Sequence, residues 1–165
     1  MQIKQDYFSL FGIEKSFFPD MRVVTDNYRR LQRQFHPDRY AGRSEQEKRL
    51  AMQMTSYLND GLRTLKDEVA RAEYLLKLAG FDIKSDAKTM QDVDFLHNQI
   101  ELREQLAELA AESELEKFIE KMDAEISDIG HRFAQDIKTD TAAAAKLLQQ
   151  LKFYSKLKQE AKLKL

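Results

Sequence analysis

The chain has 165 residues, of which 42% are hydrophobic and 33% are charged, and its formal net charge is −1. This length suits one ordinary domain or two small ones, and the apolar fraction is enough for a buried core. Cysteine is absent, which excludes disulfides, thiolate nucleophiles and Cys-ligated zinc or iron–sulfur clusters within this chain. No apolar run is long enough to span a bilayer, and the opening stretch MQIKQDYFSLFGIEK lacks the apolar block of a signal peptide. We therefore expect a cytoplasmic protein with no membrane partner.

The charge is unevenly distributed along the chain. Residues 1–79 hold 14 Lys and Arg against 11 Asp and Glu, a net charge of +3, and the remainder hold 13 against 17, a net charge of −4. A basic half and an acidic half are typical of two surfaces with different partners, although two solvated sets of helix faces would give the same counts.

The first half of the chain has the periodicity of helices. A short apolar segment, DYFSLFGI, precedes a helix that is predicted to begin after Pro19 and Asp20. The apolar stripe of this helix consists of Val24, Tyr28, Leu31 and Phe35. After a loop around Gly42, Ser44 and Glu47 have the spacing of a capping box and predict the start of another helix. Its core-facing residues are Ala51, Met54, Leu58, Leu62 and Leu65.

The second half is also helical. VARAEYLLKLAG continues or restarts the helix as far as Gly80, and the polar stretch FDIKSDAK that follows is the best candidate for a linker. Three further helices are predicted at about 90–111, 113–138 and 140–163 from their apolar periodicity, and no strand is predicted. The predicted organisation is therefore an all-α chain with a first domain at 1–79, a linker at 80–88 and a second domain at 89–165.

The stretch QFHPDRY, residues 34–40, ends a basic helix with His36, Pro37 and Asp38. A residue that precedes a proline is pushed out of the α region, so the helix should end near Phe35 or His36. His36 and Asp38 are poorly spaced to act as a base and its orienting partner, and no nucleophile stands near them. The three histidines are far apart and form no i, i+4 pair for a metal ion. The sequence therefore predicts no enzyme, no cofactor and no metal site.

Arginines line one face of the helix before this stretch. Arg22, Arg29 and Arg33 are spaced 7 and 4 residues apart, and Arg30 lies beside them. Such a face could follow nucleic-acid phosphates, but the first half is barely basic and has no second helix aimed at base edges. An acidic protein partner fits better than a nucleic acid.

The order YRRLQRQFHPDR, flanked by DYFSLFGI and SYLNDGLRTLKD, resembles a J domain, the module that stimulates ATP hydrolysis by a DnaK-type chaperone. The resemblance implies that His36, Pro37 and Asp38 lie in the loop of an antiparallel helix pair. Together with the basic helix face, this loop would dock on the chaperone. Gly61 departs from the family, which usually has Ala there, and should cost about 1 kcal/mol of helix stability relative to Ala.

The segments RAEYLLKLAGFDI and FLHNQIELREQLAEL extend the likeness, and over its whole length the chain resembles the HscB family of iron–sulfur co-chaperones. The resemblance implies a J domain joined in an L shape to a C-terminal three-helix bundle. It also implies two partners, the chaperone HscA for the J domain and the scaffold protein IscU for the bundle. A J-domain protein that serves a different client is the alternative. Eukaryotic members often carry a Cys-rich zinc element, so this Cys-free chain resembles a bacterial, cytoplasmic member.

A helical wheel of residues 93–109 separates two faces. With Leu96 at zero, a stripe of Phe95, Leu102, Leu106 and Leu109 lies between about −140° and −80°. Leu96 and Ile100 lie at about 0° and 40°, next to four polar residues, His97, Glu101, Glu104 and Glu108. Leu96 and Ile100 either widen the buried stripe or form an exposed apolar centre. The resemblance implies the second, an IscU-binding surface of Leu96, His97, Ile100, Glu101, Glu104 and Glu108, with Phe153 from the last helix. His97 stands where a close relative has Met, so this surface has one apolar side chain fewer than that relative's.

Overall fold

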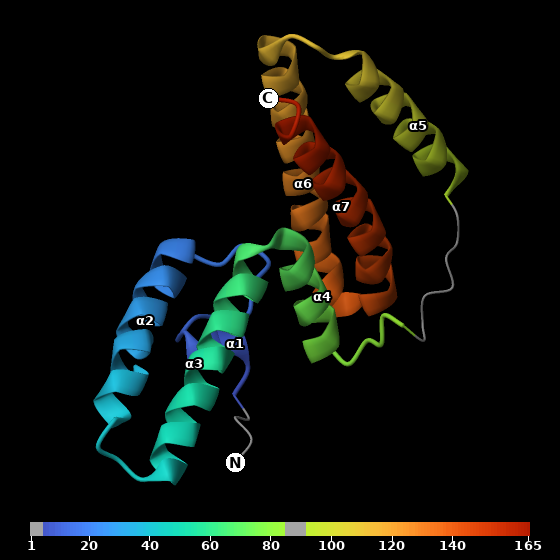
Figure 1. The fold of residues 1–165 in the computed structure, drawn as a ribbon. Coiled ribbons are helices and arrows are strands. Elements are labelled where there is room, and N and C mark those ends of the chain that lie inside the picture. The colour runs from blue at the N-terminus through green and yellow to red at the C-terminus, as the bar shows by residue number, and fades with distance from the viewer. Residues whose placement is uncertain (1–4, 85–91) are drawn as a thin grey trace. The chain divides into compact units, whose positions relative to one another are not determined.

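The computed structural model describes residues 5–84 and 92–165. Seven α-helices and one 3-10 helix make up the regular structure of these two ranges, which contain no strand (Figure 1). The chain divides into two compact units, residues 1–71 and residues 72–165, which we call the N-terminal and C-terminal units. The all-α fold class predicted from the sequence is confirmed.

The N-terminal unit is built around an antiparallel pair of helices. Its elements are α1 (Tyr7–Leu10), α2 (Met21–Gln34), the 3-10 helix η1 (Pro37–Tyr40) and α3 (Glu45–Lys66). α2 and α3 lie side by side, and α1 packs against α3. The core between them contains Phe8, Phe11, Val24, Leu58 and Leu65, all of which are buried.

Gly61 permits the close approach of α1 to α3. A Cβ atom at this position would lie 2.9 Å from Cδ1 of Tyr7 and 3.1 Å from Cε2 of Phe11. Both distances are shorter than ordinary carbon contacts, so a side chain here would push the ring-bearing segment away from α3. Glycine therefore lowers the intrinsic stability of α3, and the packing of two aromatic rings against it offsets this loss.

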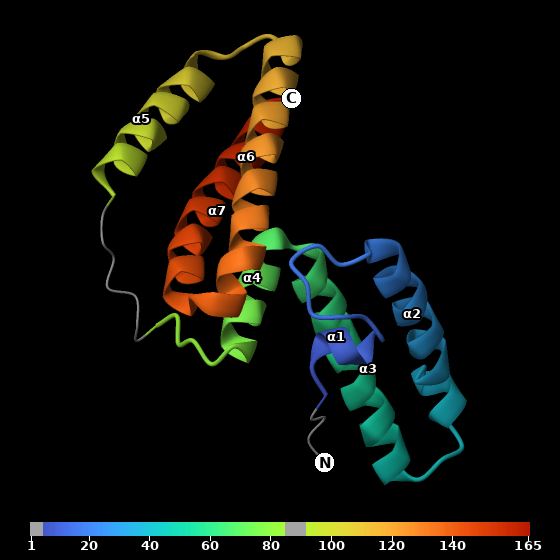
Figure 2. The same cartoon turned by 180° about the vertical axis from the view of Figure 1, so that it is seen from behind.

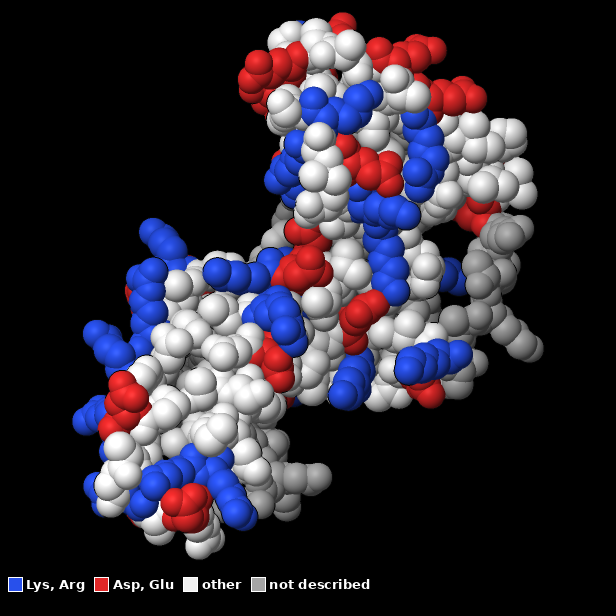
Figure 3. Space-filling view, viewed as in Figure 1, with Lys and Arg blue, Asp and Glu red and all other residues white. Residues whose placement is uncertain are grey.

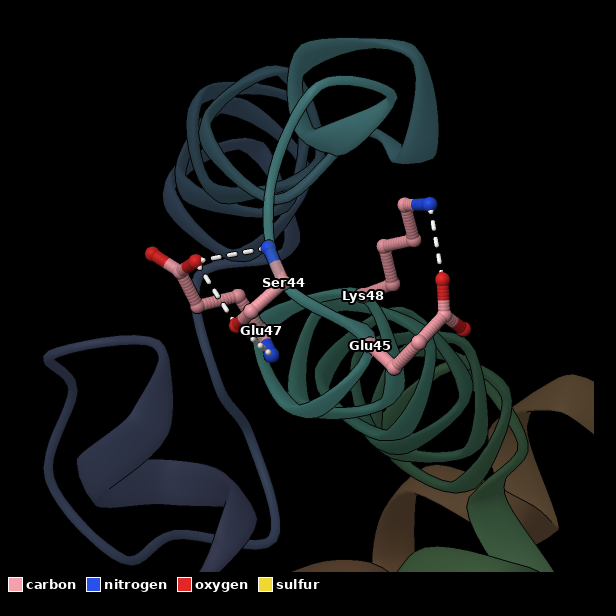
Figure 4. A network of polar contacts seen from close by, with 4 residues as sticks. All are labelled: Ser44, Glu45, Glu47 and Lys48. Atoms are coloured by element: carbon pink, nitrogen blue, oxygen red, sulfur yellow. Dashed lines mark hydrogen bonds and ion pairs between the residues drawn. The ribbon is translucent and has the colours of Figure 1, made fainter.

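The start of α3 is fixed by the predicted capping box, which is confirmed (Figure 4). The Ser44 hydroxyl oxygen accepts from the Glu47 backbone N–H at 3.3 Å, and Glu47 Oε2 accepts from the Ser44 backbone N–H at 3.0 Å. The Ser44 backbone N–H and hydroxyl both donate to the Glu47 carboxylate, and these two bonds lower its pKa. The box is therefore strongest above the ordinary carboxyl range and weakens as the pH falls through the lowered pKa.

Arg71 is a buried cation that the sequence did not single out. Its Nε donates to the Phe17 carbonyl and one terminal nitrogen donates to the Leu65 carbonyl, each at 2.6 Å. The guanidinium carbon also lies 4.8 Å from the centroid of the Phe17 ring. Burial lowers the pKa of this guanidinium. Arg71 thus joins the segment before α2 to the end of α3, and it marks the last residue of the N-terminal unit.

The helix α4 (Glu68–Leu78) passes from the first unit into the second. The sequence assigned it to the first domain, whereas its residues from Ala72 onward belong to the C-terminal unit. Leu75 and Leu76 are buried there, and Glu73 forms an ion pair of 2.7 Å with Lys152. Local periodicity cannot identify which neighbour a continuous helix packs against. The linker predicted at 80–88 lies partly outside the described residues.

Three helices follow in the C-terminal unit, α5 (Val93–Glu108), α6 (Glu112–Thr139) and α7 (Thr141–Lys162). They match the three predicted helices, although the predicted start near residue 90 lies outside the described residues. Asp140 ends α6 and caps α7, because its side chain accepts from the Ala143 N–H at 3.0 Å. Figures 1 and 2 show α7 between α5 and α6. The core contains Leu102 and Leu106 from α5, Phe118, Met122, Ile129 and Phe133 from α6, and Leu148, Leu151 and Leu157 from α7.

Candidate functional site

The His-Pro-Asp triplet lies at the junction of α2 and η1. His36 is extended, with φ −59° and ψ 131°, as the following proline requires, and Pro37 begins η1. The His36 ring turns back over η1, so that its Nδ1 accepts from the Asp38 backbone N–H at 3.3 Å. Both side chains are exposed. The proline therefore ends the helix and presents an imidazole and a carboxylate on a short, ordered turn.

One contact from η1 itself and one from α3 hold this turn in place. Arg39 in η1 donates to the Arg33 carbonyl, in the last turn of α2, at 3.3 Å. The Thr55 hydroxyl of α3 lies 3.2 Å from the Phe35 carbonyl oxygen. Both contacts hold the backbone just before the triplet, so the loop is pre-organised for recognition.

The geometry of the His36 ring decides which of its nitrogens can reach a partner. Nδ1 accepts the Asp38 N–H, so in the neutral ring the hydrogen is on Nε2. Asp38 Oδ2 lies 3.6 Å from the same Nδ1, which cannot donate to the carboxylate while it accepts from the backbone. The two residues therefore do not form a base and its orienter. Nε2–H is left as a donor toward an external acceptor.

The four arginines predicted on one side of α2 are all exposed: Arg22, Arg29, Arg30 and Arg33. Figure 3 shows basic side chains projecting along the edge of the N-terminal unit where α2 lies. Arg22 lies 3.8 Å from Asp20 and Arg29 lies 4.0 Å from Asp26. Pairs this long and this exposed contribute little, about 0–1 kcal/mol, so the arginines keep most of their capacity to attract an acidic surface.

In the C-terminal unit, Leu96 and Ile100 do not widen the buried stripe of α5. Their exposed fractions are 48% and 49%, whereas Leu102 and Leu106 on the other face are 4% and 6% exposed. The acidic neighbours Glu101, Glu104 and Glu108 and the nearby His97 are exposed as well. α5 therefore carries an apolar centre bordered by carboxylates, and this set of exposed residues is called the α5 face below.

Val93 belongs to the same face and was missed by the sequence reasoning. It is 63% exposed and lies at about 60° on the wheel, between Ile100 and Glu104. The helical spacing of Val93, Leu96 and Ile100, which are 3 and 4 residues apart, was a signal that could have found it.

Phe153, which the family resemblance added to this surface, is buried. It is only 8% exposed and lies beneath α5, with its ring centroid 5.6 Å from that of Phe95 in an edge-on arrangement. The guanidinium of Arg103 also lies 5.6 Å from the Phe153 ring. Phe153 therefore supports α5 from below and does not contribute an exposed contact in this structure.

The described residues contain neither a metal site nor a membrane span. No group of three or more His, Asp or Glu side chains could hold a metal ion in residues 5–84 and 92–165. In the same ranges, no helix combines the length and apolar character needed to cross a membrane.

Comparisons with known proteins identify a family and a fold. A family model described as the HSCB C-terminal oligomerisation domain matches residues 91–162. The co-chaperone protein HscB homolog of Shewanella loihica is 40% identical over 163 residues, which cover 94% of each chain. The chaperone HscB from Vibrio cholerae has a TM-score of 0.82 and 36% identity, covering 96% of each chain. The human co-chaperone protein HscB has a TM-score of 0.88 and 29% identity, covering 99% of this chain and 84% of that one.

Identity at this level over nearly the whole chain, on the same all-α fold, shows that the protein belongs to the HscB family of co-chaperones, which are not enzymes and whose partner is a chaperone of the Hsp70 type.

Proposed function

We propose that the protein stimulates ATP hydrolysis by HscA, a DnaK-type chaperone, and delivers the scaffold protein IscU to it during iron–sulfur cluster assembly and transfer. One observation carries this proposal: the chain has two exposed recognition surfaces of different character, a polar loop beside a basic helix in one unit and an apolar centre bordered by carboxylates in the other. Such a pair of surfaces suits a protein that binds two different partners.

On the chaperone side, His36, Pro37 and Asp38 would make the specific contacts. The Nε2–H donor of His36 and the exposed Asp38 carboxylate offer one donor and one acceptor group within a fixed turn. The basic face of Arg22, Arg29, Arg30 and Arg33 would steer the encounter with an acidic surface of HscA. Residues 1–79 would act as the J domain.

On the scaffold side, Leu96 and Ile100 would enter the interface as its apolar centre. His97, Glu101, Glu104 and Glu108 would form the rim, and Phe153 would act from below by supporting α5. A few apolar side chains within a charged rim favour a modest, reversible interaction, which a scaffold that must be released requires. Residues 89–165 would act as the scaffold-binding bundle of a cytoplasmic protein with no nucleic-acid partner.

The proposal is tested by measuring the ATPase of purified HscA alone, with this protein, and with this protein and IscU together. We expect stimulation by the protein and a further increase with IscU, since delivery places both partners on one chaperone. A pull-down from bacterial extract tests the alternative. Recovery of a DnaK-type chaperone with a different client, and no binding of purified IscU, would favour a J-domain protein that serves another client.

A further inference from the structure

The carboxyl end of α5 is held by a residue distant in sequence. Leu109, which follows the helix, is extended, with φ −70° and ψ 127°. The ammonium group of Lys164 donates to the carbonyl oxygens of Leu106 and Leu109, at 2.7 Å each. A cation at this position also interacts favourably with the negative end of the helix dipole. Lys164 thus serves as a cap for α5, although it follows α7 in the chain.

A second polar contact lies beside this cap. Arg103 of α5 forms an ion pair of 3.6 Å with Glu160 of α7. The same two residues line an open cavity of about 280 Å³, together with Leu106, Ala107 and Lys164. At this end, therefore, the polar contacts of Arg103 and Lys164 join α5 to the end of the chain beside the buried side chain of Leu106.

The amino end of α5 is attached differently. Phe95 packs edge-on against Phe153, and the Asn98 amide donates to the Tyr154 hydroxyl at 2.7 Å. Leu102 in the middle of the helix and Leu106 in its last turn are buried. α5 therefore rests on α7 through aromatic contacts at one end and through the Lys164 cap and the Arg103 ion pair at the other.

We propose that Lys164 is a positioning residue for the α5 face. By holding the carboxyl end of α5 on α7, it keeps Leu96, Ile100 and their acidic rim in one orientation, so that the partner does not have to order the helix when it binds. This inference rests on the proposed function of the α5 face. The same charge-assisted contacts make the effect dependent on a cation at residue 164 and not on bulk alone.

The experiment compares Lys164→Met, Lys164→Arg and a matched control, Lys162→Met, which removes the same charge from the exposed last turn of α7. Two quantities are measured on the full chain: the dissociation constant for purified IscU and the hydrogen exchange of α5, α6 and α7 amides. We expect Lys164→Met to bind IscU about five- to tenfold more weakly. This loss follows if the fraction of molecules with α5 held on α7 falls to between one fifth and one tenth of the total. Exchange should become faster in α5 and stay unchanged in α6 and α7.

Lys164→Arg should restore both readouts, because it keeps the charge and the donors, and Lys162→Met should behave as the wild type. The inference is overturned if Lys164→Met matches Lys162→Met in both readouts. It is also overturned if exchange accelerates throughout α6 and α7, which would indicate general destabilisation, or if binding weakens while α5 exchange does not change, which would indicate a direct contact. The double variant Leu96→Ala/Ile100→Ala is measured in parallel. Unchanged IscU binding by that variant would refute the proposed α5 face itself and not the role of Lys164 alone.

Discussion

The candidate site of the N-terminal unit and that of the C-terminal unit present different kinds of side chain by different means. In the first, His36 and Asp38 stand on a short turn, which backbone contacts from Arg39 and Thr55 hold in place. In the second, Leu96 and Ile100 stand on one face of a regular helix, whose own hydrogen bonds already fix their spacing. A polar loop therefore needs local restraints to hold its geometry, whereas a helix needs only to be oriented.

The two sites also bind through different kinds of interaction. A histidine, a carboxylate and exposed arginines act through directional hydrogen bonds and charge, which depend on geometry and on salt. Exposed leucine and isoleucine act through removal of apolar area from water, which is less directional and nearly independent of salt. Substitutions in the two sites should therefore impair different interactions, and only those in the first site should show a strong dependence on salt.

The largest expected effect is the loss of one activity, ATPase stimulation, with no change in the other, IscU binding. His36→Gln should abolish stimulation of the HscA ATPase, because the glutamine amide cannot reproduce an imidazole held by Nδ1 with Nε2–H facing outward. Folding should be unaffected, since the side chain is exposed and contributes little to a core. ATPase assays and IscU titration of the same variant measure both sites, and IscU binding should be unchanged. Full stimulation by His36→Gln would refute the role of the triplet.

The second prediction affects only the C-terminal unit. Leu96→Ala/Ile100→Ala should lose IscU binding, melt near the wild type and still stimulate HscA in the absence of IscU, because both side chains are about half exposed. The matched control is Leu102→Ala on the buried face of the same helix, which should cost about 2–5 kcal/mol of folding free energy. Thermal melting and IscU titration distinguish the two faces. A large drop in the melting temperature of the double variant would place Leu96 and Ile100 in the core.

The third prediction sharpens the contrast in salt dependence. Arg29→Glu/Arg33→Glu should slow association with HscA about tenfold at low salt, and the wild-type rate should fall as salt rises. Arg132→Glu/Lys117→Glu, on exposed positions of α6, changes the net charge equally and should have a much smaller effect. Stopped-flow association rates measure both variants. Equal rates for the two pairs, or a wild-type rate independent of salt, would show that α2 does not steer the encounter.

The smallest expected effect concerns the packing of α1 against α3 in the N-terminal unit. Gly61→Ala gains about 1 kcal/mol of helix propensity, but its Cβ would lie 2.9 Å from the Tyr7 ring, and such overpacking costs roughly 1–3 kcal/mol. We expect a net loss of about 1 kcal/mol of folding free energy, on these values. Gly42→Ala, where no atom lies within 4 Å of the new Cβ, should be neutral or slightly stabilising. Urea denaturation of both variants measures the change in folding free energy. A Gly61→Ala variant more stable than the wild type would contradict this prediction.

The local structure was predictable from the sequence because its causes are local. A capping box joins residues three apart, and a proline restricts the residue before it, so the starts of α2 and α3 and the turn at His36 follow from neighbouring residues. Gly80 likewise has φ 83° just beyond α4, as expected of a glycine after a helix. Apolar periodicity identified the helices that follow the linker, and the family resemblance rested on short, contiguous segments.

The burial of individual side chains was decided only by the tertiary structure. On the wheel, Leu96 and Ile100 could have belonged to the core of the bundle or to its surface. They are exposed because α7 packs on the opposite face of α5. Phe153 could be assigned to the last helix but not to the space beneath Phe95. The reason for a glycine at position 61 lies in Tyr7 and Phe11, and the cap of α5 comes from Lys164. These contacts join residues about fifty or more positions apart, and helical periodicity records which residues share a face but not which element will cover it.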